Sequence, residues 1–319
     1  MTSYWLSAAA ITLACFAIVT AATSALIALA APALARRAER YSPASRAALL
    51  FRVRLLPAAC ATACAFGIAL PVFLCFEPRD SGETFARTLI VVAAAGGAFL
   101  ARGAWRAAAG HLATARLMRE WQARGRRLNA LDAPLPAFAI EASFPTVAVV
   151  GFSRPALFIA EHVLRECSAD EVRAMALHEC AHVAHRDNLK RFLIWACPDV
   201  LRRGGALDRA WSSAAEEAAD ARAAAGNPRF ALDLAQALIR VARLASGAST
   251  LDLASTFYLG GSIESRVRRL LEPSDSLPDP SRPLGRVTAC AMVCVFAVLV
   301  VLAAPAIHQG METAVRFLP

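Results

Sequence analysis

The chain has 319 residues, of which 57% are hydrophobic and 18% are charged, so it is too apolar and too poor in charge for a typical soluble protein. The net charge of +9 at pH 7 fits membrane topology and attraction to anionic lipid headgroups. Direct nucleic-acid binding would need a basic, aromatic-rich surface, and a chain with three tyrosines and no such run argues against it.

Three apolar stretches in the first third of the chain predict transmembrane helices. Residues 4–35 carry no charge and form a longer run than a bilayer requires. A cleaved signal peptide is the alternative, but the run is too long for one and no positive region precedes it. Residues 55–76 suit a second span, whereas residues 88–101 are short for a third, which extends over 88–108 if Arg102 and Arg106 reach to the interface. We therefore expect a first domain of three spans over residues 1–108.

The distribution of arginines predicts the orientation of these spans. Arginines crowd the loop after the first span and the segment after the third, whereas acidic residues offset the two arginines of the loop between the second and third. By the positive-inside rule, the first loop and residues 109–284 are cytoplasmic. A fourth apolar stretch at 287–307 predicts a last span within residues 285–319, which puts both termini outside the membrane.

Residues 109–284 are expected to fold as an α+β domain. Strands at 146–150 and 156–160 flank a Ser153-Arg154-Pro155 turn and predict a small hairpin. Helices are expected at 227–244 and 262–272. The proline-containing segment 273–283 is typical of a stiff linker and would lead into the last span.

A helix over about 168–185 carries the main motif. Ser168 and Glu171 have the spacing of a capping box, in which each side chain satisfies a backbone donor at the start of the helix. In the HExxH sequence that follows, His178 and His182 share one helix face and can bind one metal ion, while Glu179 can take a proton from a bound water. The alternative is a core helix with two hydrogen-bonded histidines, which would bury three polar groups without a metal.

Zinc would need a third protein ligand and an open position for water. His185 lies two turns from His178, about 10 Å away by helical rise, and is too far to share the ion. Asn188 stands where the longer metzincin pattern has its third histidine. Asp187 is predicted to point to the opposite face of the helix.

Glu216 is the remaining candidate. In an alanine-rich helix it shares one face with Asp220, so one carboxylate can bind zinc while the other holds the outer N–H of a ligand histidine. Glu217 points about 100° away and is expected to be solvated. The alternative for this segment is an exposed, acidic helix face.

Several motifs follow one another along the chain: the run at 146–155, the strand at 157–159, the Ser168 helix start, the HExxH through Asn188, and Glu216 with Asp220. With these motifs in this order, the chain resembles the integral-membrane zinc metallopeptidases of the BlaR/MecR type, the antirepressor peptidase family. The resemblance covers residues 120–275 and extends to the number and order of the membrane spans. The resemblance implies a zincin-like domain in which His178, His182 and Glu216 bind zinc and Glu179 is the general base.

The resemblance also implies a function. It suggests an endopeptidase of the bacterial cytoplasmic membrane, with a cytoplasmic active site, that cuts a protein or peptide such as a winged-helix transcriptional repressor after a signal crosses the membrane. Self-cleavage on activation is a further suggestion. Members that sense β-lactams carry an extracellular penicillin-binding domain after the last span, and the sequence ends about a dozen residues beyond its own last span, so we expect no β-lactam receptor role.

The sequence also suggests a substrate-binding strand and leaves two alternative functions open. We expect the strand at 157–159 to be a sheet edge that pairs with an extended substrate. HtpX-like or CAAX-type membrane metalloproteases share the HExxH and E-x-x-x-D motifs but place fewer spans before the HExxH. A catalytically silent signalling subunit of the same fold would have no need of Glu179. Beyond the lipid bilayer and the substrate, the sequence predicts no partner and no oligomeric state.

Overall fold

The computed structural model describes residues 2–78, 87–129, 131, 133–200, 205–224, 227–247, 263–272 and 309. The predicted linker at 273–283 and the predicted fourth span at 287–307 lie outside these residues. The elements in chain order are α1 (Thr2–Ala38), α2 (Pro43–Cys64), η1 (Ala65–Ala69), α3 (Leu70–Phe76), α4 (Arg87–Arg124), β1 (Arg126–Arg127), β2 (Ala137–Ile140), β3 (Val147–Val150), β4 (Ala156–Ala160), α5 (Glu161–Glu166), α6 (Ala169–Ala184), α7 (Asp187–Ala196), α8 (Ala206–Ala224), α9 (Pro228–Gly247) and α11 (Ile263–Leu271).

Three helical segments are long and apolar enough to cross a membrane, namely Tyr4–Ala38, Pro43–Phe76 and Arg87–Arg124. Each contains one of the three stretches expected from the sequence, and the second begins at Pro43, well before the expected residue 55. At 1.5 Å per residue each is about 50–57 Å long, whereas the hydrocarbon core of a bilayer is about 30 Å thick. Each helical segment is therefore longer than the hydrocarbon core. The third helix differs from the expectation, because it does not end near residue 108 but continues to Arg124 through a run rich in alanine and arginine that no proline interrupts.

Small residues let the long helices pack closely. Gly96 in α4 lies against α1, where a Cβ at this position would be 2.0 Å from the carbonyl oxygen of Leu13, so the contact requires glycine. Phe16 of α1 is fully buried and packs with Ala61 and Ala65. The second segment contains a π-helical turn, η1, between α2 and α3.

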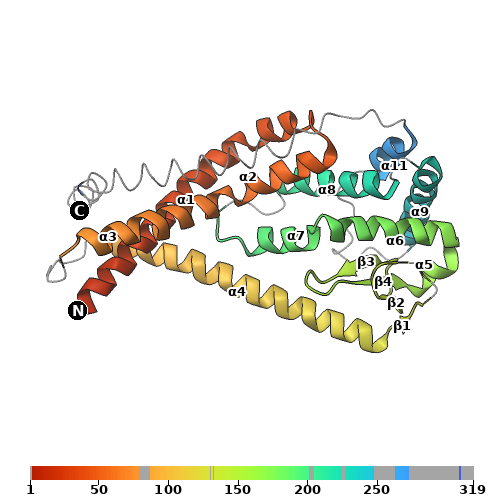
Figure 1. The fold of residues 1–319 in the computed structure, drawn as a ribbon, viewed down its shortest axis with the longest axis horizontal. Coiled ribbons are helices and arrows are strands. Elements are labelled where there is room, and N and C mark those ends of the chain that lie inside the picture. The colour runs from red at the N-terminus through yellow and green to blue at the C-terminus, as the bar shows by residue number, and fades with distance from the viewer. Residues whose placement is uncertain are drawn as a thin grey trace.

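α1 and α2 lie side by side, whereas α4 meets them near the N-terminus and diverges from them toward the other end of the molecule, where the sheet and the remaining helices lie (Figure 1). In this wider part α8 contacts α1 and α2, and α7 contacts α4. Both α7 and α8 also contact α6, which carries the HExxH motif. The motif helix is therefore joined to the long helices through two shorter ones.

The sheet has four strands in the order β1-β2-β4-β3. β3 and β4 pair antiparallel, which confirms the predicted hairpin, and β4 pairs parallel with β2 on its other side. The expectation that residues 157–159 form a sheet edge is wrong, because β4 is a central strand with all five residues buried. The uninterrupted apolar run of β4 is typical of a strand covered on both faces, and the edge beside it is β3.

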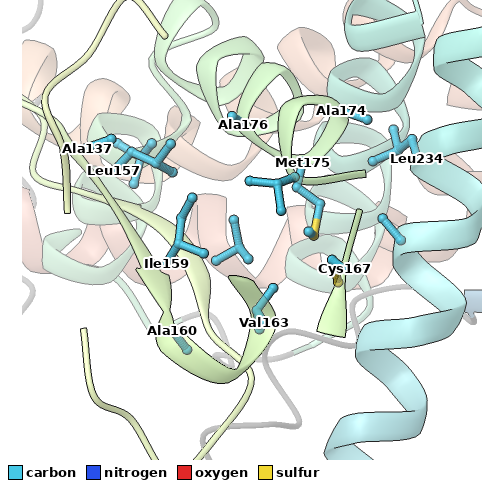
Figure 2. Packing of buried hydrophobic residues seen from close by; sticks show 14 residues of the cluster. Ala137, Leu157, Ile159, Ala160, Val163, Cys167, Ala174, Met175, Ala176 and Leu234 are labelled. Atoms are coloured by element: carbon cyan, nitrogen blue, oxygen red, sulfur yellow. The ribbon is translucent and has the colours of Figure 1, made fainter. Parts of the chain in front are cut away.

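The core of the α+β part lies between the sheet and helices α5, α6 and α9. Leu157 and Ile159 of β4 point toward Met175 of α6, with Val163 of α5 below them and Leu234 of α9 at the side (Figure 2). All five side chains are buried. This packing fixes α6 against the sheet and so sets which way its histidines face.

Candidate metal centre

The capping box fixes the start of the motif helix. The Ser168 hydroxyl oxygen accepts from the Glu171 backbone N–H at 3.2 Å, and the Glu171 carboxylate accepts from the Ser168 N–H at 2.6 Å. The helix then runs to Ala184, with His185 at its C-terminal end. Both ends match the sequence-based prediction, because they depend on residues close together in the chain.

His178 and His182 lie one turn apart, and both are buried. Their Nε2 atoms are 3.2 Å apart, and their rings are almost perpendicular. A ligand atom of Glu179 lies with them in a group whose members are all within 4.8 Å of one another. These three residues could hold a metal ion.

Glu216 approaches the two histidines from α8. One carboxylate oxygen is 3.4 Å from His178 Nε2, and the other is 3.5 Å from His182 Nε2. Arg191 of α7 also contacts this carboxylate at 3.0 Å. The structure thus brings the predicted third ligand to the same two ring nitrogens.

Asp220, one turn further along α8, faces the other nitrogen of His178. Its Oδ1 is 2.9 Å from His178 Nδ1, close enough to pair electrostatically although the two are not aligned as a hydrogen bond. Asp220 also accepts two hydrogen bonds from Arg266, at 2.8 Å from Nε and 2.7 Å from Nη2. Asp220 therefore lies on the outer side of His178, the place in which the sequence led us to expect it, and its role toward a metal ligand stays a prediction.

Asp187 takes the corresponding place beside His182. Its Oδ2 is 2.9 Å from His182 Nδ1, and its other oxygen accepts from Lys190 Nζ at 2.9 Å. The expectation that Asp187 faces away is wrong, because the motif helix does not continue to it. Arg186 adopts a left-handed conformation with φ 57°, which ends α6 and turns Asp187 back toward His182.

Arg266 is a site residue that the sequence reasoning missed. It comes from α11, 88 positions from His178, and its guanidinium is buried. Besides the two bonds to Asp220, its Nη1 is 3.3 Å from a Glu216 oxygen. The only signal in the sequence was the basic helix expected at 262–272, and nothing in that pattern singled out one arginine.

Glu179 faces the edge strand of the sheet. Its carboxylate accepts from the backbone N–H of Val149 in β3 at 2.9 Å. Asn188 holds the same strand, because its side-chain amide donates to the carbonyl oxygens of Val149 at 2.8 Å and Gly151 at 3.0 Å. β3 and the motif helix are thus joined directly at the candidate general base.

Glu217 also differs from the expectation of a solvated side chain. It is buried and forms ion pairs with Arg46 of α2 and Arg269 of α11, and Ser213 donates to it at 3.0 Å. The periodicity correctly turned it away from the histidines. The sequence could not indicate that a second helix, α2, covers that face of α8.

The carboxylates make this site favourable for positive charge. Burial lowers the pKa of His182, but its contacts with Asp187 and Glu216 outweigh burial and raise the pKa to about 10. His178 is affected in the same way: burial lowers its pKa, but Asp220 and Glu216 give a net upward shift. Burial works to raise the pKa of Glu216, and the two histidines more than reverse this, holding it well below its ordinary value.

Comparison with known proteins adds no assignment. No protein-family model matches the chain, and neither a curated protein nor a solved structure matches it.

Proposed function

We propose that the protein is a membrane-embedded zinc endopeptidase whose active site is the His178–His182–Glu216 centre. The observation that carries the proposal is the close approach of four possible ligand atoms. The two Nε2 atoms are 3.2 Å apart, one Glu216 oxygen is 3.4 Å from the Nε2 atom of His178, and the other Glu216 oxygen is 3.5 Å from that of His182. A tetrahedral zinc site with ligand bonds of about 2.0–2.1 Å has edges of about 3.3–3.4 Å between ligand atoms. The spacings between neighbouring ligand atoms are therefore of the size that such a site requires, and the three side chains would supply its protein ligands.

The residues around the three ligands support the same assignment. Histidine ligands of zinc usually direct the other ring nitrogen to a carboxylate or carbonyl, which fixes the tautomer. Asp187 lies on the Nδ1 side of His182 and Asp220 on that of His178, each at 2.9 Å. Zinc would bind in place of a proton on each Nε2 atom, so that both ligands would be neutral imidazoles in the metal-bound site.

Catalysis is assigned to Glu179. Zinc, when bound, supplies Lewis-acid polarisation of the scissile carbonyl and a bound water of lowered pKa. The Glu179 carboxylate would accept a proton from the attacking water and later deliver it to the leaving amine, acting first as a general base and then as a general acid. An extended substrate would lie along β3, where a substrate carbonyl can take the Val149 N–H that Glu179 now accepts.

The biological role follows from the resemblance described above. We assign the substrate to a cytoplasmic regulatory protein such as a transcriptional repressor, and the peptidase domain to the cytoplasmic side of a bacterial membrane. The last residues of α1, the first of α2 and the last of α4 lie toward the sheet (Figure 1), in agreement with the arginine-rich segments being on the side of the active site. The convergence of Glu179 with all three ligands favours an enzyme over a silent subunit.

The test separates metal binding from catalysis. Purified full-length protein should carry about one zinc, and His178→Ala, His182→Ala or Glu216→Ala should each lose most of it. Glu179→Gln should keep zinc and fold but lose about 10²–10⁴-fold in peptide cleavage, including any self-cleavage mapped by mass spectrometry. Glu166→Gln, at an exposed position in α5, is the matched control and should keep both. Unchanged cleavage by Glu179→Gln would remove the enzyme assignment from this site.

A further inference from the structure

α8, the helix that supplies Glu216, packs against α2 on the side that faces away from the histidines. α2 and α8 run antiparallel, with an ion pair at each end of their contact: Arg46 pairs with Glu217, and Arg54 pairs with Asp208 at 2.7 Å. Arg54 is almost completely buried and also pairs with Asp199. Buried apolar side chains of the two helices belong to one cluster at this contact: Ala47, Leu50, Leu207, Trp211, Ala214 and Ala215.

Glu217 is the residue that links this contact to the metal centre. It follows Glu216 directly in the chain, so it projects about 100° around the same helix. Its carboxylate is held by Arg46 from α2 and by Arg269 from α11, the helix that also presents Arg266 to Glu216 and Asp220. Glu217 is therefore held from two sides while its neighbour faces the histidines.

A small turn of α8 is enough to matter for a metal ligand. Side-chain ends lie about 5–6 Å from a helix axis, so a rotation of about 20° moves a carboxylate by about 2 Å. This equals a whole zinc–oxygen bond, and metal affinity requires ligand distances within about 0.2 Å. The rotational setting of α8 must therefore be fixed, and Glu217 is a buried charge whose two arginine partners fix it.

From these observations we infer that Arg46 and Glu217 are positioning residues for the metal centre: their ion pair sets the rotation of α8 and so places Glu216 for metal binding. Because Arg46 belongs to α2, the position of α2 also determines the rotation of α8. A displacement of α2 relative to α8 changes the metal site without any contact between α2 and the metal. The inference rests on the proposed metal site and adds to it the residues that control its geometry.

The test measures Co²⁺ and Zn²⁺ binding to the full-length protein in detergent. Arg46→Gln and Glu217→Gln should each lower Co²⁺ affinity by about 10-fold and change the visible absorption of the bound Co²⁺, which reports coordination geometry. The double variant should be no worse than Glu217→Gln alone, because that change already removes the pair with Arg46 together with the pair with Arg269. Arg46→Lys should restore the affinity to within about 3-fold. Arg52→Gln, the same change at an exposed position of α2, should have no effect.

The outcomes distinguish this inference from the proposed function. Wild-type affinity and spectrum in both Gln variants would overturn the inference while leaving the metal site intact, and so would additive losses in the double variant. A wild-type protein that binds neither metal would overturn both. If Arg46→Gln does not fold, Glu217→Gln, which keeps the size of the side chain, provides the same measurement. An unchanged affinity in that variant would refute the role of the pair.

Discussion

Replacing Asp187 with asparagine tests how much the tautomer of His182, which Asp187 fixes, contributes to metal affinity. Asp187 is almost completely buried, and its two oxygens accept from His182 Nδ1 and from Lys190 Nζ, each at 2.9 Å. An asparagine has one oxygen and one NH₂ group, and the lysine ammonium can only donate. The amide oxygen must therefore turn to Lys190 and the NH₂ group to His182. That orientation makes Nδ1 an acceptor and puts the imidazole proton on Nε2, the nitrogen that should bind the metal.

The expected loss of zinc affinity in Asp187→Asn is about 10–100-fold, or about 1.4–2.7 kcal/mol. A chelator competition titration of the full-length protein at neutral pH measures it, with circular dichroism to confirm folding. Removing the lysine should restore part of the loss, because in Asp187→Asn with Lys190→Met the amide oxygen is free to accept from His182. Asp170→Asn, at an exposed position in the first turn of α6, is the control and should bind zinc normally.

Two results would refute this reasoning. The first is a zinc affinity of Asp187→Asn within about 3-fold of the wild type, since a carboxylate that orients a ligand is worth more than that. The second is a double variant with Lys190→Met that binds zinc no better than Asp187→Asn alone. In that case the loss would come from charge and not from the tautomer of His182.

Three further predictions concern the fold and its orientation. Gly96→Ala should destabilise the protein in detergent by about 1–3 kcal/mol, whereas Gly97→Ala, where the nearest atom to a new Cβ is 3.8 Å away, should unfold at the wild-type temperature. Ser168→Ala should cost about 1 kcal/mol of stability through loss of the helix cap, measured by denaturant unfolding, and an unchanged midpoint would contradict the role of the capping box. A topology reporter inserted after Glu39 should read cytoplasmic and one inserted after Pro78 external, and the same reading from both would show that α2 to α3 does not cross the membrane.

The parts of the site that the sequence predicted depend on local spacing. The capping box, the shared face of His178 and His182, and the shared face of Glu216 and Asp220 all follow from a regular helix, and the structure has these helices. The hairpin of β3 and β4 is local in the same sense. Periodicity is reliable for such features because the relevant residues are at most a few turns apart.

The parts that could not be predicted depend on a break in regularity or on contacts between distant segments. The direction of Asp187 was predicted wrongly because Arg186, one residue before it, adopts a left-handed conformation that ends α6. A left-handed residue at a helix end is usually glycine, so the sequence did not indicate this break. Arg266 and Glu217 acquire their roles from helices that meet only in the folded chain. The central position of β4 depends on its parallel pairing with β2, which is not its neighbour in the chain, and local patterns do not indicate such a pairing.

The π-helical turn at Ala65–Ala69 has a consequence for aligning this chain with any relative. Its i→i+5 hydrogen bonds accommodate one residue more than an α-helical turn, so the side chains after it are rotated by about 100° from the positions of a regular helix. Phe73, whose ring centre is 5.2 Å from that of Tyr4, faces α1 in this shifted register. A homologue with an unbroken α-helix here would align with a one-residue gap inside an apolar span, and the two halves of the span should be compared in separate registers.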